Sequence, residues 1–441
     1  MADPSTPTPT PSFGAALRAW AYVGLNSFGG PAGQIGVMHR EIVERRGWVS
    51  EQAFLQGLNY SMLLPGPEAQ QLATYLGWRL HGLRGSVAAG ALFILPGVVA
   101  IMALSVLYAL YESTAPVQAL FYGIKPAVVA VVLVAVWRLA RRVISGRAAG
   151  AIAIGAFVAI FFLDVPFPLI VIGAALAGWG ARLGGSTREA SGRPDSSAPP
   201  ARRALTTLAV ATAVWLAPTL AVLLLVGPHS VLGQLLIFFS VAALVTFGGA
   251  YAVLAYVAQQ AVTGYGWLSA EQMVDGLGMA ESTPGPLIMV VQFVAFMAAF
   301  GAAPPLDPLA AGVLGALLVT WVTFVPSFGF IVAGAPYVEY LQGRPRLEAA
   351  LAGVTAAVVG VILNLGLWFG LQTVFAETYE LRLGPLRLHT IEPASLDVVA
   401  LVLVGLGLVL LLRLRWPLLL TLAFSASVGF VWHLLAGAIA G

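Results

Sequence analysis

The sequence predicts an all-α polytopic membrane protein of two inverted homologous halves, which contain broken or re-entrant helical hairpins and are joined by one extra transmembrane helix. Composition, an internal repeat and the distribution of charge each favour this fold class. Of 441 residues, 59% are hydrophobic and 9% are charged, and the mean hydropathy is +0.90. Water cannot solvate most of such a chain, so a lipid-embedded bundle is expected.

Several continuous apolar runs approach the roughly 20 residues that a helix needs to cross a bilayer. They cover residues 85–108, 126–137 with their flanks, 148–163, 205–226 and 396–412. Because backbone polar groups in lipid need internal partners, we expect these runs to be helices. A β-barrel is disfavoured, since its strands would alternate apolar and polar residues. Residues 1–12 are rich in Pro and Thr and are expected to form a disordered tail.

An internal repeat divides the chain. Phe28-Gly29-Gly30 aligns with Phe247-Gly248-Gly249, an offset of 219 residues, and the same offset pairs Pro65-Gly66-Pro67 with Pro284-Gly285-Pro286. Further along, an offset of 230 pairs Pro96 with Pro326 and residues 127–129 with 357–359. The expected organisation is half one at residues 13–184, a linker with one connecting transmembrane helix at 185–230, and half two at 231–441.

The connecting span has no counterpart in the repeat, and an odd connector between halves with even numbers of crossings would invert the second half. Loop charges support inversion, because cytoplasmic loops are enriched in Lys and Arg. The basic loops at 39–46 and 79–84 correspond to segments 258–266 and 298–308, which contain no Lys or Arg. Conversely, the acidic turns at Glu112 and Asp164 correspond to basic turns, at Arg344 with Arg346 and at Arg413 with Arg415. We therefore expect the N-terminus inside and the C-terminus outside, with Arg382 and Arg387 as exceptions.

Residues 13–38 and 51–78 each lie between loops expected on one side, and each has helix breakers at its middle. We expect re-entrant helical hairpins with tips that reach inward. The alternative, in which every arm spans the bilayer, leaves the parity of crossings unchanged.

The tips have the chemistry of an anion site. Pro67 suits the first position of a helix, and the backbone N–H groups that follow lack partners and lie at the positive end of the helix dipole. Two inverted halves would direct up to four such tips at one volume near the midplane. A tetrahedral oxyanion, which has several acceptor oxygens, fits such a volume.

The predicted site residues belong to these tips. The substrate contacts expected are Asn26, Ser27, Gly29, Gly30, Gln34, Pro65, Gly66, Pro67, Gln70 and Gln71 in half one, and Thr246, Gly248, Gly249, Thr283, Pro284, Gly285 and Pro286 in half two. Charge coupling, proton coupling or gating is assigned to Glu68, Arg40, Glu41, His39, Lys125 and Glu281.

Structural explanations compete with these assignments. A carboxylate at membrane depth tends to be functional, but Glu68 also suits the dipole of a helix that it begins. Lys125 could pair with an anion or a carboxylate, or extend to the interface. Positive-inside topology accounts for most of the cations near Arg40.

Other functions find no support in the sequence. The chain has no cysteine, its five histidines lack metal-ligand spacing, and Gly29-Gly30-Pro31 is not followed by the Lys of a nucleotide loop. No enzymatic motif is present. No enzymatic activity, cofactor or nucleic-acid partner is expected.

The run Asn26-Ser27-Phe28-Gly29-Gly30-Pro31, His39-Arg40-Glu41 with Gly47-Trp48, and the run from Leu64 to Ala73 resemble the chromate ion transporter family. Phe247-Gly248-Gly249 and the run from Ser282 to Pro286 resemble the C-terminal copy of its long, two-domain members. Half two departs from the pattern, since Leu287, Met289 and Val290 replace Glu68, Gln70 and Gln71.

The resemblance implies export of chromate from the cytoplasm across a bacterial inner membrane, which confers chromate resistance. We expect alternating access at the tips. Members of the family are commonly regarded as driven by the proton motive force, for instance as antiporters, although electrostatics favours carrying a proton together with the anion. Sulfate is the rival substrate, a non-transporting scaffold or intramembrane enzyme is the rival class, and a homodimer is left open.

Overall fold

The computed structural model describes residues 10–183, 201–247, 250–302, 306–337 and 345–440, which are almost entirely helical. Within these residues, six helices are long and apolar enough to cross a membrane. They are α4 (Glu68–Tyr111), α5 (Ala115–Val143), α8 (Ala201–Leu225), α13 (Pro308–Gly334), α15 (Pro345–Val374) and α17 (Leu418–Ala440). The protein is therefore a multi-pass membrane protein, as predicted, and α8 is the helix expected between the halves.

Five shorter apolar helices complete the bundle. They are α6 (Arg147–Phe161), α7 (Phe167–Gly180), α9 (Val231–Val245), α12 (Val290–Phe300) and α16 (Val398–Leu412). With 11 to 15 residues each, they are shorter than the roughly 20 residues of a full span. Each of these helices is therefore too short to cross the hydrocarbon core of a bilayer by itself.

The predicted hairpins of half one consist of short arms. α1 (Phe13–Leu25) has 13 residues, α2 (Gly30–Met38) has nine and continues as a π-helical turn, η1 (His39–Arg45), and α3 (Glu51–Leu63) has 13. The fourth arm is the first part of α4, which ends at a kink where His81 and Gly82 leave helical geometry. At about 1.5 Å per residue, an arm of 13 residues reaches about 20 Å and α2 with η1 at most about 24 Å, short of a full crossing. These lengths favour re-entrant hairpins over spanning arms.

Half two repeats these elements. α10 (Ala250–Gln259) continues as a π-helical turn, η2 (Gln260–Gly264), and α11 (Ala270–Ser282) precedes a short 3₁₀ turn, η3 (Leu287–Met289). Ser50 caps α3 and Ser269 caps α11, which keeps the offset of 219. Gly47 and Gly266, with φ of 60° and 64°, keep it as well. The sequence repeat is therefore also a repeat of local structure.

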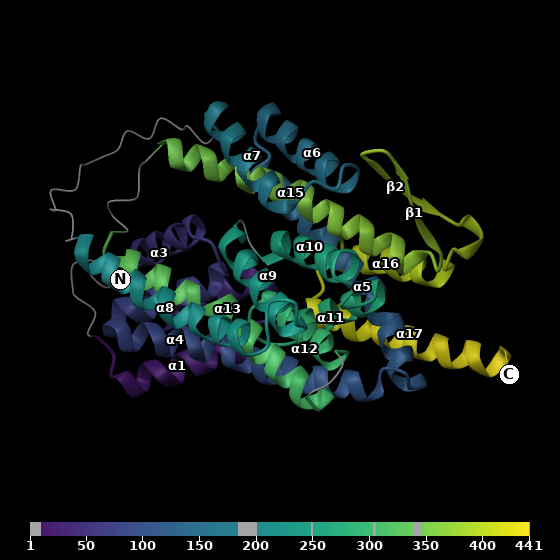
Figure 1. The fold of residues 1–441 in the computed structure, drawn as a ribbon, viewed down its shortest axis with the longest axis horizontal. Helices are drawn as coiled ribbons and strands as arrows, with labels where there is room; N and C mark the ends of the chain where they lie inside the picture. Colours follow the sequence, from purple (N-terminus) through teal and green to yellow (C-terminus); the bar gives the residue numbers. More distant parts are fainter. Residues whose placement is uncertain (1–9, 184–200, 248–249, 303–305, 338–344, 441) are drawn as a thin grey trace.

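Each half packs two of its helices against a helix of the other half. α6 and α7 of half one pack on α15 of half two, whereas α16 and α17 of half two pack on α5 of half one. Figure 1 shows α6, α7 and α15 together along one side and α17 beside α5. The division at residues 184 and 231 is a division of the sequence, because in space the halves interleave.

The tips of the hairpins meet by two equivalent hydrogen bonds. The Gly66 amide donates to the carbonyl of Thr246 (2.8 Å), and the Gly285 amide donates to the carbonyl of Ser27 (2.9 Å). The offset of 219 relates both the donors and the acceptors. The two bonds are therefore reciprocal, and each half supplies the partner for the other half's Pro-Gly-Pro turn.

One segment of half two departs from the helical pattern of the rest. Strands β1 (Thr378–Leu383) and β2 (Leu386–Ile391) form an antiparallel hairpin in which Leu381 pairs with Leu388. Gly384, at φ 62°, makes the turn. The alternating apolar and polar residues of this stretch are the pattern of a strand, and the hairpin lies beside α16 (Figure 1).

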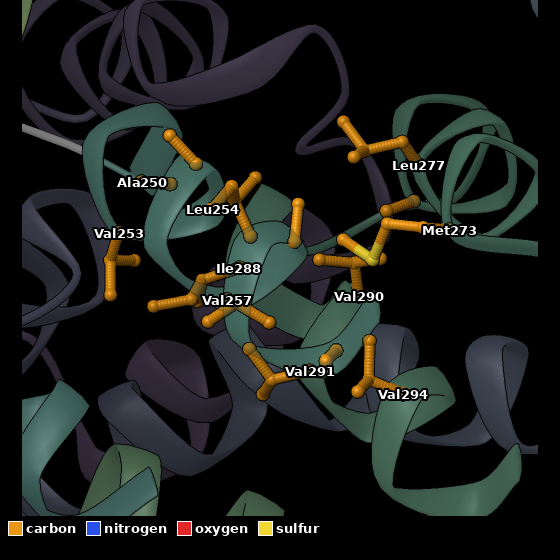
Figure 2. Packing of buried hydrophobic residues seen from close by; sticks show 14 of the residues in the cluster. Ala250, Val253, Leu254, Val257, Met273, Leu277, Ile288, Val290, Val291 and Val294 are labelled. Carbon is orange, nitrogen blue, oxygen red and sulfur yellow. The ribbon is translucent and has the colours of Figure 1, made fainter. Parts of the chain in front are cut away.

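The largest apolar core surrounds α10, η3 and α12. Figure 2 shows Val253, Leu254 and Val257 of α10 close to Ile288 and Val291, and all of these side chains are buried. α12 is buried from Val290 to Ala299. The tip of half two is consequently surrounded by packed side chains rather than by open space.

Candidate functional site: a cationic cavity between the halves

A cavity of about 440 Å³ lies where the two halves meet. Helix α5 forms one wall with residues between Val131 and Val143, and the tip of half one forms another with Gly29, Gly30 and Pro31. Half two contributes the start of α10, two residues of α15, and Leu411, Trp416 and Leu418. Both halves therefore line the cavity.

Three helices begin at this cavity. α2 starts at Gly30 after Gly29, which has a φ of 81° that favours glycine. α4 starts at Glu68 and α10 at Ala250, and both residues line the cavity. The first turns of a helix leave backbone N–H groups without partners at the positive end of its dipole. The cavity thus receives partial positive charge from three directions.

Two arginines add full charges. Arg138 and Arg142 are four residues apart on α5, so they lie on one face of the helix, and both line the cavity. The guanidinium of Arg142 interacts electrostatically with the carboxylate of Glu68. Arg141 does not line the cavity, because its guanidinium lies 4.8 Å from the ring centre of Trp137.

The predicted tip residues of half one divide into two groups. Gly29, Gly30 and Glu68 line the cavity. Ser27 is buried, and its hydroxyl donates to the carbonyl of Val23 (2.6 Å), whereas Asn26 is exposed and donates to the carbonyl of Tyr22 (2.8 Å). Ser27 and Asn26 thus complete the end of α1 and do not line the cavity.

The glutamines of half one bind protein partners. The Gln34 amide donates to the carbonyl of Gly285 (2.6 Å), and the Gln71 amide donates to the carbonyl of Pro65 (2.7 Å). Gln70 donates to the hydroxyl of Thr74 (3.1 Å). Gln34 and Gln71 therefore stabilise the tips, Gln70 bonds within α4, and none of the three lines the cavity.

Half two contributes less to the cavity than predicted. The Thr246 hydroxyl donates to Ala242, and the Thr283 hydroxyl donates to Ala280. The turn Pro284-Gly285-Pro286 packs behind the cavity, where the Gly285 amide is held by Ser27. Gly248 and Gly249 lie outside the described residues. Among the described tip residues, Gly29 and Gly30 line the cavity, whereas neither Pro65, Gly66 and Pro67 nor the Pro-Gly-Pro turn of half two does; half one's second tip reaches it through Glu68, the residue that follows Pro67.

Glu281 lies one side chain behind the cavity. It is 2% exposed, and its Oε1 accepts a hydrogen bond from the Tyr251 hydroxyl (2.6 Å). Tyr251 lines the cavity directly. The other oxygen of Glu281 has no hydrogen-bond partner among the described residues. The Glu281 carboxylate is therefore connected to the cavity by its hydrogen bond with Tyr251.

The predicted gating residues form ion pairs away from the cavity. Glu41 is buried and pairs with Arg45 (3.1 Å) and Arg46 (2.6 Å), and His39 lies 2.6 Å from Glu51. Arg40 is exposed and does not line the cavity.

Lys125 also lies apart from the cavity, 3.5 Å from Glu271 and 3.8 Å from Asp275, whose carboxylate accepts from the Tyr108 hydroxyl. Of the two alternatives that the sequence left open for Lys125, the structure shows pairing with carboxylates.

The spanning helices and the cationic cavity define a polytopic membrane protein of the transporter class. The sequence model of the family described as "Chromate transporter" matches residues 15–179 and 233–430. The chain therefore belongs to the chromate transporter family, a family of transporters rather than of enzymes, and the two matched segments correspond to its two halves.

Curated relatives carry the same description. The chain is 34% identical to the chromate transport protein of Pseudomonas aeruginosa, over 80% of each chain. It is 30% identical to the probable chromate transport protein of Synechococcus elongatus, over 80% of this chain and 83% of the relative. The chromate transport protein of Cupriavidus metallidurans is 28% identical, over 80% and 82%. No solved structure matches the chain.

Proposed function

We propose that this protein exports chromate from the cytoplasm by alternating access. The observation that carries the proposal is the cavity in which Arg138, Arg142 and three helix N-termini converge. Chromate is a tetrahedral dianion, and such an anion is stabilised by guanidinium groups together with free backbone N–H groups. The relatives described as chromate transport proteins supply the identity of the anion.

Loop charges give the direction. The cavity is bounded by the basic end of α5, with Arg138 and Arg142, and by Trp416 and Leu418, which follow Arg413 and Arg415. Basic segments are retained in the cytoplasm, so this cavity is open toward the inside. A potential of about 100 mV, negative inside, then contributes about 4.6 kcal/mol to expelling a dianion, twice the roughly 2.3 kcal/mol of one charge. Export is therefore the favoured direction even without a coupled ion.

Glu68 provides a route to proton coupling. Its carboxylate lines the same cavity as Arg138 and Arg142. Protonation of Glu68 would remove a negative charge beside the anion and leave the positive charges of the arginines uncompensated. The mechanism that follows is binding of a proton and a dianion in the same cycle.

Flux in proteoliposomes tests the proposal. With a potential that is positive in the lumen, vesicles that contain the purified protein should accumulate chromate, and protein-free vesicles should not. Glu68→Gln should retain accumulation driven by the potential and lose its response to a pH gradient. If the purified protein moves no oxyanion under either gradient, the transporter assignment fails.

Sulfate is the second candidate substrate, because its size, shape and charge nearly match those of chromate. Competition in the same vesicles separates the two anions. Chromate uptake that persists in excess sulfate supports the chromate proposal. Equal transport of both anions makes the protein a general exporter of tetrahedral dianions.

A further inference from the structure

A second, much smaller cavity lies along the same pair of helices as the first. It measures about 20 Å³ and is lined by Ala255, Gln259 and Thr263 on the α10 side, and by Asn364, Leu365 and Trp368 of α15. Glu380, Arg387 and His389 of the β-hairpin cover it. A volume of this size holds about one water molecule and excludes an oxyanion.

The two cavities follow one another along the helices. Tyr251 of α10 lines the large cavity and Ala255 the small one, whereas on α15 the change occurs between Ile362 and Asn364. Four residues of α-helix rise about 6 Å, so about one turn of packed side chains separates the two spaces. Leu254, which lies in that turn, is fully buried in the apolar cluster of Figure 2.

The repeat relates the lining of the small cavity to helices α2 and α5 of half one. The offset of 219 converts Gly36 and Arg40 into Ala255 and Gln259, and the offset of 230 converts Ala135 and Arg138 into Leu365 and Trp368. In half one, both helices line the large cavity, α5 with Ala135 and Arg138 and α2 with residues just before Gly36. In half two, the equivalent helices α10 and α15 pack against each other. One sequence repeat thus occurs in an open and a closed arrangement.

A network of polar contacts around the buried Arg387 holds the closed arrangement together. Gln259 donates a hydrogen bond to Asp164, and the Arg387 guanidinium lies 3.1 Å from the same carboxylate. Arg387 is 6% exposed and also donates to the carbonyl of Ile160 (3.0 Å). Asp164 has a φ of 52°, which is unusual for a residue other than glycine. These contacts connect α10, the α6–α7 turn and the β-hairpin.

Three polar atoms at the small cavity remain without hydrogen-bond partners in these contacts. The Arg387 Nε, the His389 Nδ1 and the Gln259 Oε1 are buried and have no hydrogen-bond partner among the described residues. Buried polar atoms normally have partners, and a partner that arrives in another conformation explains such exceptions. A guanidinium Nε and an imidazole are donors suited to an anion.

We infer that the small cavity beneath the β-hairpin is the closed outer mouth of the transport pathway, and that Arg387 is the cation that an outgoing oxyanion meets there. The inference rests on the proposed function and extends it by naming the exit. Opening requires α10 to separate from α15 and Asp164 to release Arg387, while α2 approaches α5. The two halves thereby exchange their arrangements, as expected for inverted repeats.

Paired cysteines test the inference, and the chain has no cysteine of its own. Ala255→Cys with Leu365→Cys places a pair across the closed mouth, and Ile35→Cys with Ala135→Cys places a pair on the two helices that line the open cavity in half one. A short bifunctional thiosulfonate reagent should join the outer pair in the resting protein and lower chromate flux roughly tenfold, and reductant should restore the flux. The inner pair should join slowly at rest and faster during turnover.

Single variants test the inference independently of cross-linking. Asn364→Cys should react with a membrane-impermeant thiol reagent added outside the cell only when chromate is being exported. Arg387→Gln should lower export at least about fivefold while chromate binding from the inside stays within about twofold. Arg382→Gln is the matched control, because Arg382 is exposed and lies 3.6 Å from the same Asp164.

Three results would overturn the inference. They are full flux with the outer pair joined, reaction of Asn364→Cys that does not depend on turnover, and equal effects of the two arginine substitutions. If the wild-type protein transports no oxyanion, the proposed function fails instead. The relative rates of joining the inner and outer pairs at rest still test the open and closed arrangements in that case.

Discussion

Replacement of the two cavity arginines should weaken chromate binding by an amount that Coulomb's law sets. A guanidinium about 6 Å from a dianion attracts it by about 1.4 kcal/mol in bulk water and about 5.5 kcal/mol at an effective dielectric constant of about 20. Because the cavity is open, the lower figure applies. Arg138→Gln or Arg142→Gln should then raise the dissociation constant at least about tenfold. The double variant should abolish measurable flux.

The assay is chromate uptake at graded concentrations in proteoliposomes, together with equilibrium binding in detergent. Arg141→Gln is a close control, since it removes the same charge from the same turn of α5 but lies over Trp137 and not at the cavity. Its dissociation constant should stay within about twofold of the wild-type value at physiological salt, because screening acts on exposed charges. If Arg141→Gln weakens binding as much as Arg142→Gln, the arginines act through general surface charge and the cavity is not the binding site.

Gly285→Ala should lower the thermal unfolding midpoint in detergent more than Gly384→Ala does. Both glycines have positive φ, but only at Gly285 would the new Cβ lie 3.0 Å from the Cα of Gly97; equal losses would contradict this. Gln34→Leu should cost about 1–3 kcal/mol, because it leaves the Gly285 carbonyl without its side-chain donor, and an unchanged midpoint would show that the contact contributes nothing. Burial and the nearby Arg387 lower the pKa of His389. The unfolded hairpin therefore binds a proton below about pH 6.5 that the folded hairpin does not, and its stability falls as the pH drops through that value. Hydrogen exchange of the β2 amides, corrected for intrinsic rate, should show this loss, and His389→Phe should remove the pH dependence.

The sequence predicted the helical bundle, the two halves and the connecting helix, because these depend on long apolar runs and on a repeat that is visible without coordinates. The arrangement of the halves in space was not predictable from it. α6 and α7 pack on α15, which lies far from them in the sequence. Several other helices have apolar faces of similar composition, so the sequence does not indicate which of them α6 and α7 contact. The same limit explains why the Pro-Gly-Pro turns were expected at the cavity, although no residue of either turn lines it.

The site was predicted where local chemistry suffices and missed where it depends on tertiary contacts. Gly29, Gly30 and Glu68 line the cavity because helix breakers determine where α2 and α4 begin. Gln34 and Gln71 were expected to contact the substrate, but they donate to backbone carbonyls at the tips. A polar side chain at membrane depth serves a substrate or a structural partner, and composition does not distinguish the two.

The paired hydrogen bonds at the tips have a consequence for the smallest unit that can fold. Each Pro-Gly-Pro turn leaves an amide that only the opposite half satisfies, at Thr246 for Gly66 and at Ser27 for Gly285. A single half inserted alone would expose that amide, together with the apolar faces that α6 and α7 bury on α15. Each half is therefore expected to be stable only beside the other. Gene fission would then yield two subunits that have to associate in the membrane before either becomes stable.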